Sequence, residues 1–217
     1  MLWPLFQLTL AVLAAQAPPA APPGGRVREA REATEMLMHF AALPSASGDA
    51  EGAGQAATWV QERFRELGFD TRTLQAEGNP LVLAERKVAS PSLTVLFYMH
   101  YDTQPTGPAE DWPATGGEPF HPHLLSGKWG DRGTESMQPT SLDERSIGTA
   151  RVYGRGIADD KAPIVMHLIA LKRWLATPVA GRIHLKYLLD GEEEAGSPHI
   201  EASLGRNRQL LESDLLV

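Results

Sequence analysis

Segments with the hydrophobic period of a helix alternate along this chain with short apolar segments typical of buried strands. In the first three helical segments, apolar residues recur every three or four positions. The helical segments are residues 27–43, 50–67, 162–176 and 200–213. The strand segments are residues 69–75, 80–86, 93–100, 182–190 and 213–217. Helices interleaved with strands predict an α/β fold, with a mixed, mostly parallel sheet flanked by helices.

Residues with known preferences at helix ends support three of these helices. Pro44 stops the first one. Asp49 is a good N-cap for the second, and Gly68 is a good residue to follow its last turn. Pro163 is tolerated in the third because it falls in the first turn.

Residues 103–150 are rich in Gly, Pro, Ser and Thr and show no clear periodicity. A compact domain rarely contains so long a structureless stretch. We therefore expect part of it to form an excursion around a functional site and part to be disordered. A strand and a turn then lead into "VYGRGIADDKAP" at 152–163.

The first 26 residues differ in composition from the rest. Residues 2–15 form an uncharged apolar run, and Ala15-Gln16-Ala17 matches the small-x-small pattern of a signal-peptide cleavage site. We expect a signal peptide at 1–17, a Pro/Gly-rich linker at 18–26 and one domain at 27–217, in a secreted or periplasmic protein. Because no Lys or Arg precedes the apolar run, the alternatives are an uncleaved anchor and a misassigned start codon, the latter implying a cytoplasmic protein.

Charge and cysteine content exclude several classes of function. The net charge of −7 argues against nucleic acid or an acidic membrane surface as the main partner. The chain has no cysteine, which excludes disulfides, thiolate catalysis and zinc sites built from Cys. Any metal ion must therefore be held by His, Asp and Glu.

Three strand ends carry residues of the kind that bind metal ions. They are "HYD" at 100–102, "ADDK" at 158–161 and "EEEAGS" at 192–197. Singly, each is weak: "HYD" also suits a strand that runs into a turn, a Gly-rich loop with acids is usually a turn, and three successive glutamates are usually a solvated surface run. Together they are informative, because functional sites in α/β sheets gather at the carboxyl ends of strands. Residues two apart in a strand lie on the same side, so His100 and Asp102 can point into one pocket.

These residue types suit a pair of divalent ions. Two such ions need a carboxylate between them, and a further carboxylate that does not ligate must take a proton from water. His100 can ligate, with Asp102 orienting its ring. Asp159 or Asp160 can bridge. The glutamates at 192–194 can supply a ligand and a base, and the choice between Glu192 with Glu193 and Glu193 with Glu194 stays open.

The segments "YMHYDTQP", "VYGRGIADDK" and "DGEEEAGS" resemble the three N-terminal motifs of a family of co-catalytic zinc metallopeptidases. That family includes carboxypeptidase G, aminoacylase, carnosinase-type dipeptidases, acetylornithine deacetylase and succinyl-diaminopimelate desuccinylase. The resemblance runs from about residue 30 to the end of the chain, and "LGFDTRTL" and "DWP…EPF" also fit. It implies the N-terminal part of a zinc-peptidase-like catalytic domain.

The resemblance implies a role for five residues. His100 ligates one zinc ion and Asp102 supports it, while Asp159, the first Asp of "DDK", bridges both ions. The family pattern Glu-Glu-x-Gly-Ser makes Glu193 the general acid/base and Glu194 the ligand of the second ion. Two Zn²⁺ ions occupy a complete site of this kind, and Co²⁺ or Mn²⁺ are substitutes.

The implied reaction is hydrolysis of an amide bond in a small peptide or an N-acyl amino acid. The family also has a further acidic ligand, a distant His and an inserted lid domain through which dimers form, and the chain ends at Val217 before any of these. We therefore expect this chain to be a fragment with little activity, and a homodimer only where the lid is present. The alternatives are a non-catalytic remnant that binds metal weakly and a two-metal phosphohydrolase, although no basic cluster adjoins the acidic motifs.

The other histidines are assigned no role in the site, and His184 has no acidic neighbour in its own strand. They are His39, His121, His123, His167, His184 and His199.

Overall fold

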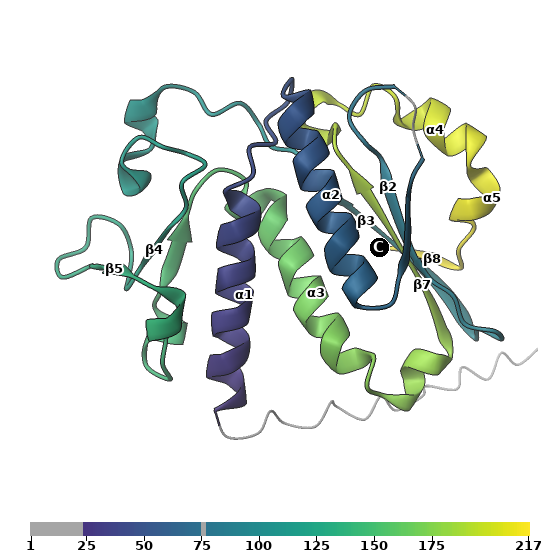
Figure 1. The fold of residues 1–217 in the computed structure, drawn as a ribbon, viewed down its shortest axis with the longest axis horizontal. Helices are drawn as coiled ribbons and strands as arrows, with labels where there is room; N and C mark the ends of the chain where they lie inside the picture. The colour runs from purple at the N-terminus through teal and green to yellow at the C-terminus, as the bar shows by residue number, and fades with distance from the viewer. Residues whose placement is uncertain (1–23, 75–76) are drawn as a thin grey trace, which may run out of the picture.

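The computed structural model describes residues 24–74 and 77–217. The predicted signal peptide at 1–17 and most of the linker at 18–26 lie outside the described residues. Within them, helices pack on both faces of a five-stranded sheet, and a small second sheet lies to one side (Figure 1).

The central sheet has the strand order β1-β2-β7-β3-β8. Its strands are β1 (Asp70–Thr73), β2 (Val82–Arg86), β7 (Ile183–Asp190), β3 (Leu93–His100) and β8 (Leu215–Leu216). Strand β2 pairs antiparallel with both of its neighbours, whereas β7 with β3 and β3 with β8 pair in parallel. All strands except β2 therefore run in the same direction, which confirms the predicted mixed, mostly parallel sheet.

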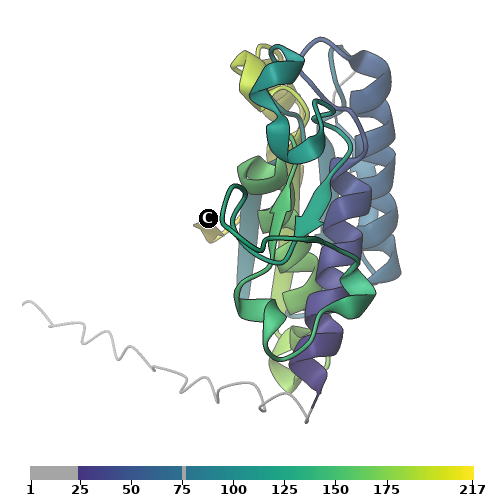
Figure 2. The same cartoon turned by 90° about the vertical axis from the view of Figure 1, so that its left-hand side faces the viewer.

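Helices cover the two faces of this sheet unequally. Three helices, α1 (Gly25–Ala41), α2 (Ala50–Glu66) and α3 (Ala162–Trp174), pack on one face. Two shorter ones, α4 (Ile200–Arg206) and α5 (Arg208–Leu211), lie against the other. Figure 2 shows α1 and α2 on one side of the sheet and the yellow C-terminal helices on the other. Among these helices none is long and apolar enough to cross a bilayer.

Successive side chains of the strands pack alternately into two hydrophobic cores, one on each face of the sheet. Val95 and Met99 of β3 belong to the large core beneath α1, α2 and α3, in which Phe64, Leu168 and Tyr187 are also buried. Leu96 and Leu188 point the other way and pack with Leu81, Ile200 and Leu211 beneath α4 and α5. The period-two pattern of a strand buried on both faces explains this division.

The excursion at 103–150 is more regular than its sequence indicates. It contains β4 (His123–Leu125) and β5 (Ser136–Met137), which join β6 (Arg151–Tyr153) in an antiparallel sheet, and several short 3₁₀ turns. It is attached to α1, because Arg31 Nε donates a hydrogen bond to the carbonyl oxygen of buried Leu142 (2.9 Å). Strands of two or three residues are too short to show a hydrophobic period.

The parallel pairing of β3 with β7 determines where the motifs lie. In their register His100 is opposite Asp190, so both strands end at the same edge of the sheet. The segments that follow, 101–104 and 191–197, therefore lie side by side. The third motif lies in η5 (Ile157–Lys161), a distorted π-type turn between β6 and α3.

Candidate metal centre

Four side chains from three distant segments meet at this edge of the sheet. His100 ends β3, Asp159 lies in η5, and Glu193 and Glu194 belong to the 3₁₀ turn η7 (Glu193–Ala195). His100 Nε2 is 2.8 Å from Asp159 Oδ1 and 4.0 Å from Glu193 Oε2. One ligand atom from each of His100, Glu193 and Glu194 lies within 4.8 Å of the other two. The structure thus brings the residues predicted to surround the metal together, and their chemical roles remain predictions.

Asp102 connects two walls of the centre. Its side chain is fully buried, and Oδ1 lies 3.3 Å from His100 Nδ1. Its carboxylate also accepts the backbone N–H groups of Glu193 (3.2 Å) and Glu194 (3.1 Å). A hydrogen bond from Nδ1–H to a carboxylate leaves Nε2 of the imidazole available as the ligand atom. Asp102 therefore orients the histidine ring and also holds the glutamate turn.

The two aspartates of "DDK" have different positions. Asp159 has a largely exposed side chain and contacts the ring of His100. Asp160 Oδ2 instead accepts the backbone N–H of His100 (3.3 Å), and burial raises the pKa of its carboxyl group. The peptide bond between the two is cis. Of the two bridging candidates, Asp159 is the one whose carboxylate faces the imidazole.

The three consecutive glutamates also separate. Glu192 is 8% exposed and lies behind the centre, where it accepts the backbone N–H of Asn79 (3.0 Å) and pairs with His199 Nδ1 (2.9 Å). Glu192 precedes the 3₁₀ turn and has a non-helical backbone conformation (φ −137°, ψ 12°), and Asn79 and His199 engage its carboxylate. The geometry therefore places Glu193 and Glu194, and not Glu192, beside His100.

Lys161 fixes the segment that carries Asp159. Its side chain is fully buried, and Nζ donates to the carbonyl oxygens of Phe40 (3.2 Å) and Leu43 (2.8 Å) at the end of α1. Burial lowers the pKa of the Lys161 ammonium to about 7. This tether joins η5 to a long helix of the main core.

A contact outside the predicted set involves Gln104. Its Nε2 donates to Glu194 Oε2 (2.8 Å) and is 3.3 Å from the Glu194 carbonyl oxygen. The sequence held a signal for it, because Gln104 lies two residues beyond Asp102 and thus on the same side of an extended chain.

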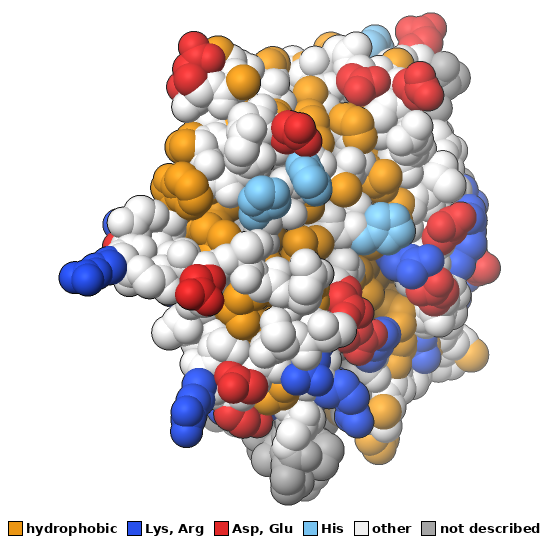
Figure 3. All heavy atoms as spheres, turned by 60° about the vertical axis from the view of Figure 1, so that its left-hand side comes forward, with side chains coloured by type: hydrophobic (Ala, Val, Ile, Leu, Met, Phe, Trp, Pro, Cys, Tyr) orange, Lys and Arg blue, Asp and Glu red, His pale blue; other side chains and the backbone are white. Residues whose placement is uncertain are grey.

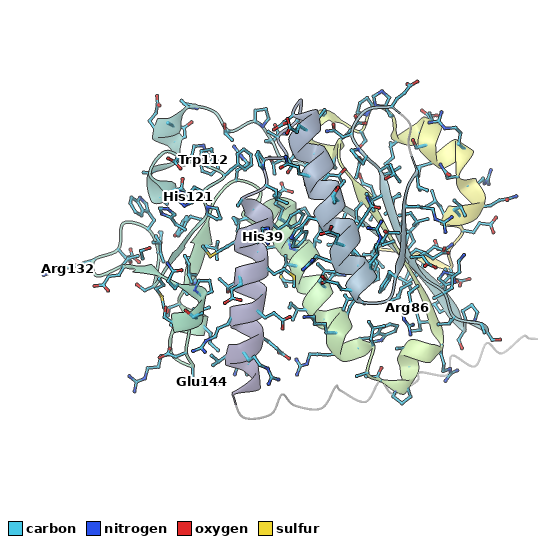
Figure 4. All side chains as sticks on the ribbon, in the orientation of Figure 1. His39, Arg86, Trp112, His121, Arg132 and Glu144 are labelled. Atoms are coloured by element: carbon cyan, nitrogen blue, oxygen red, sulfur yellow. The ribbon has the colours of Figure 1, made fainter. Side chains whose placement is uncertain are left out.

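The remaining histidines have partners elsewhere. Figure 4 labels His121 in the excursion and His39 on α1, and Figure 3 shows the face of the molecule on which histidine side chains reach the surface beside acidic ones. His121 pairs with Glu118 (3.3 Å) and lies edge-on to His123. His184, which has no acidic neighbour in its own strand, is 3.0 Å from Glu85 across the sheet. The pairing of β2 with β7 brings these two residues close together, and the sequence alone did not predict that pairing.

The donor set fits a divalent cation. Burial lowers the pKa of His100, but the hydrogen bonds to Asp102 and Asp159, together with the negative charges of Asp102 and Asp160, outweigh it and raise that pKa to about 9. Among the described residues, no Lys or Arg side chain forms an ion pair with Asp159, Glu193 or Glu194. An imidazole and several carboxylates without a basic partner are the N and O ligands that zinc accepts in proteins.

Known proteins match the part of the chain that forms this centre. A family model for the peptidase family M20/M25/M40 matches residues 96–214. The cysteinylglycine-S-conjugate dipeptidase of Corynebacterium striatum is 29% identical over 198 residues, which are 88% of this chain and 36% of that protein. The succinyl-diaminopimelate desuccinylase of Variovorax paradoxus is 28% identical over 166 residues, 74% of this chain and 35% of that protein.

Solved structures share the fold. The M20 family metallo-carboxypeptidase Sso-CP2 of Sulfolobus solfataricus has a TM-score of 0.63 at 26% identity, over 86% of this chain and 36% of that chain. Human carnosine dipeptidase 1 has a TM-score of 0.63 at 20% identity, over 88% and 39% of the two chains. This chain therefore spans about a third of the length of its relatives. Since the matched residues include all three motifs and more than half of the chain, the protein belongs to the M20/M25/M40 peptidase family.

Proposed function

We propose that the protein is a metal-dependent hydrolase of amide bonds in small peptides or N-acyl amino acids. The observation that carries this proposal is the convergence of His100, Asp159, Glu193 and Glu194 from three distant segments. Their ligand atoms face one another, and buried Asp102 holds two of the three segments together. The names of the relatives, two kinds of peptidase and a desuccinylase, support this substrate class.

The proposed metal site uses side chains of known position. His100 and Glu194 would each hold one zinc ion, and Asp159, beside the ring of His100, would be shared by both. Bound zinc would supply Lewis acidity, which polarises a substrate carbonyl and lowers the pKa of water. The protein's contribution is to fix these ligands, through the contacts of Asp102 with His100 and with the glutamate turn.

Glu193 is the proposed proton carrier. Its carboxylate is 4.0 Å from His100 Nε2, too far for a hydrogen bond, and its side chain is 43% exposed, so water and substrate can reach it. The carboxylate takes one proton from the attacking water while the water oxygen bonds to the carbonyl carbon. As the C–N bond breaks, Glu193 gives that proton to the nitrogen. The products are a carboxylic acid and a free amine.

The decisive experiment compares Glu193→Gln with the unsubstituted protein, both zinc-loaded and both in a version extended past Val217 to the length of the relatives, on a panel of dipeptides and N-acyl amino acids. Loss of proton transfer is expected to lower kcat by about 10²–10⁴-fold, with zinc affinity little changed. Glu201→Gln, at an exposed position of α4, is the matched control and should change neither kcat nor zinc affinity.

Other results would support the alternatives. Hydrolysis of phosphate esters but not amides would indicate a two-metal phosphohydrolase. Zinc binding without turnover of any substrate, or equal turnover by Glu193→Gln and wild type, would favour a non-catalytic metal-binding domain.

We also propose export of the protein, on the sequence of residues 1–17 alone. The mature N-terminus determined by mass spectrometry after expression in a secreting host tests it, with cleavage near Ala17 expected. An uncleaved, cell-associated protein would contradict it.

A further inference from the structure

Gln104 continues the row of side chains that begins with His100. Thr103 forms a parallel bridge with Ala46, and its N–H donates to the Ser45 carbonyl oxygen (2.9 Å), so the chain stays extended after β3. Alternate side chains of an extended chain share a side. His100, Asp102 and Gln104 therefore all face the centre, whereas Thr103 is buried on the opposite side.

This row contacts Glu194 at three points. The Glu194 N–H donates to Asp102 Oδ2 (3.1 Å). The Gln104 amide reaches both the carbonyl oxygen (3.3 Å) and the carboxylate Oε2 (2.8 Å) of the same glutamate. Backbone donor, backbone acceptor and side chain of one residue are thus held by one neighbouring segment.

Glu194 needs such support because its own element is short. The 3₁₀ turn η7 has three residues and ends at Gly196, which adopts a left-handed conformation. A glutamate side chain has three rotatable torsions, and ordering it has an entropic cost. Among the described residues, no other side chain donates a hydrogen bond to the Glu194 carboxylate.

A neutral donor suits this position. Lysine or arginine could also bind Oε2, but its positive charge would repel a divalent cation a few ångströms away. An amide N–H fixes the carboxylate and leaves its negative charge intact. One occupied lone pair on Oε2 also leaves Oε1 free, since a carboxylate has about four acceptor positions.

We propose that Gln104 is a positioning residue, which orders the Glu194 carboxylate for metal binding without touching the metal itself. The inference rests on the proposed function, because it requires a metal ion at Glu194. It adds a residue outside the ligand and base set that the motifs imply.

The test measures zinc affinity by competition with a chromophoric chelator for Gln104→Met and Gln209→Met. Methionine keeps the length of the side chain but has no donor. Gln209, an exposed residue of α5, is the matched control. Loss of an outer partner of a ligand is expected to weaken zinc binding about 10-fold in Gln104→Met and not in Gln209→Met. The melting temperature of the metal-free protein should stay unchanged, and the visible spectrum of bound Co²⁺ should change.

Three outcomes would overturn the inference. Equal zinc affinity of the two variants would remove the role of Gln104. A fall in metal-free stability that matches the fall in affinity would indicate a structural role only. The third arm is Glu194→Gln. If Glu194→Gln binds zinc as tightly as wild type does, Glu194 is no ligand, and both the proposed metal centre and the inference fail. If Glu194→Gln binds zinc weakly but Gln104→Met binds it as tightly as wild type does, only the role of Gln104 is overturned.

Discussion

Replacing Asp102 by Asn tests how much of the metal centre depends on one buried carboxylate. Asp102 contacts His100 Nδ1 and accepts two backbone N–H groups of the glutamate turn, all at 3.1–3.3 Å. Asn has the same size but one acceptor oxygen, so its NH₂ group must face one of these donors. Outer partners of metal ligands contribute about 10–100-fold to affinity, and we expect a loss of that size for zinc at pH 9.

The same substitution has an opposing effect at neutral pH. Zinc can bind only after the proton on His100 is lost. With a His100 pKa of about 9, the apparent zinc affinity of the wild type at pH 7 is about 100-fold lower than that of the fully deprotonated ring. Asp102→Asn removes one of the two hydrogen bonds that raise this pKa, and the negative charge of Asp102 with it, so the proton competes less with zinc in the variant. The defect seen at pH 9 should therefore shrink, or vanish, at pH 7.

The assay is a zinc titration of both proteins at pH 7 and pH 9, with free zinc buffered by a chelator. Titration of the His100 ring by NMR in the metal-free proteins gives the pKa directly, and a lower value is expected in the variant. An equal loss of affinity at both pH values would refute the link between Asp102 and the protonation of His100. No loss at pH 9 would refute its role in holding the ligands.

Two further predictions concern the scaffold. Leu168→Ala in α3 removes a fully buried side chain from the main core and should lower the unfolding free energy, measured by urea titration, by about 3 kcal/mol. Met166 is 67% exposed on the same helix, so Met166→Ala should change the unfolding free energy by less than about 1 kcal/mol. The second concerns Lys161. Burial lowers the pKa of its ammonium from 10.5 to about 7, so between these two pH values the Lys161 side chain binds more protons in the unfolded chain than in the folded one. The unfolding free energy of wild type relative to Lys161→Met should therefore rise with pH across that window, and a flat or falling difference would contradict the assignment.

The elements with strong periodicity were predicted well. Strand 93–100 has the expected bounds, and α2 and α3 end within two residues of expectation. The predicted helix at 200–213 is two helices: α4 ends at Arg206, and the side chain of the following residue, Asn207, donates hydrogen bonds to the Ser203 and Leu74 carbonyl oxygens. In the excursion, strands of two or three residues have no period to detect.

For the site, spacing alone placed His100 and Asp102 on one side of a strand end, and the structure agrees. Spacing could not select two of three adjacent glutamates. The selection depends on tertiary contacts, since Asn79, which is 113 residues away, and the nearby His199 hold Glu192 behind the centre. The second function of Asp102, as an acceptor for the glutamate turn, likewise depends on the pairing of β3 with β7.

That pairing has a consequence for synthesis on the ribosome. In the sheet, β7 lies between β2 and β3, so these two early-made strands are joined into one sheet only when the later-made β7 inserts between them. A nascent chain that ends before β7 already contains His100 and Asp159 but lacks the glutamates that complete the cluster. Closure of the sheet at β7 and completion of the cluster at Glu193 and Glu194 therefore both depend on residues 183–194, which are synthesised after most of the domain.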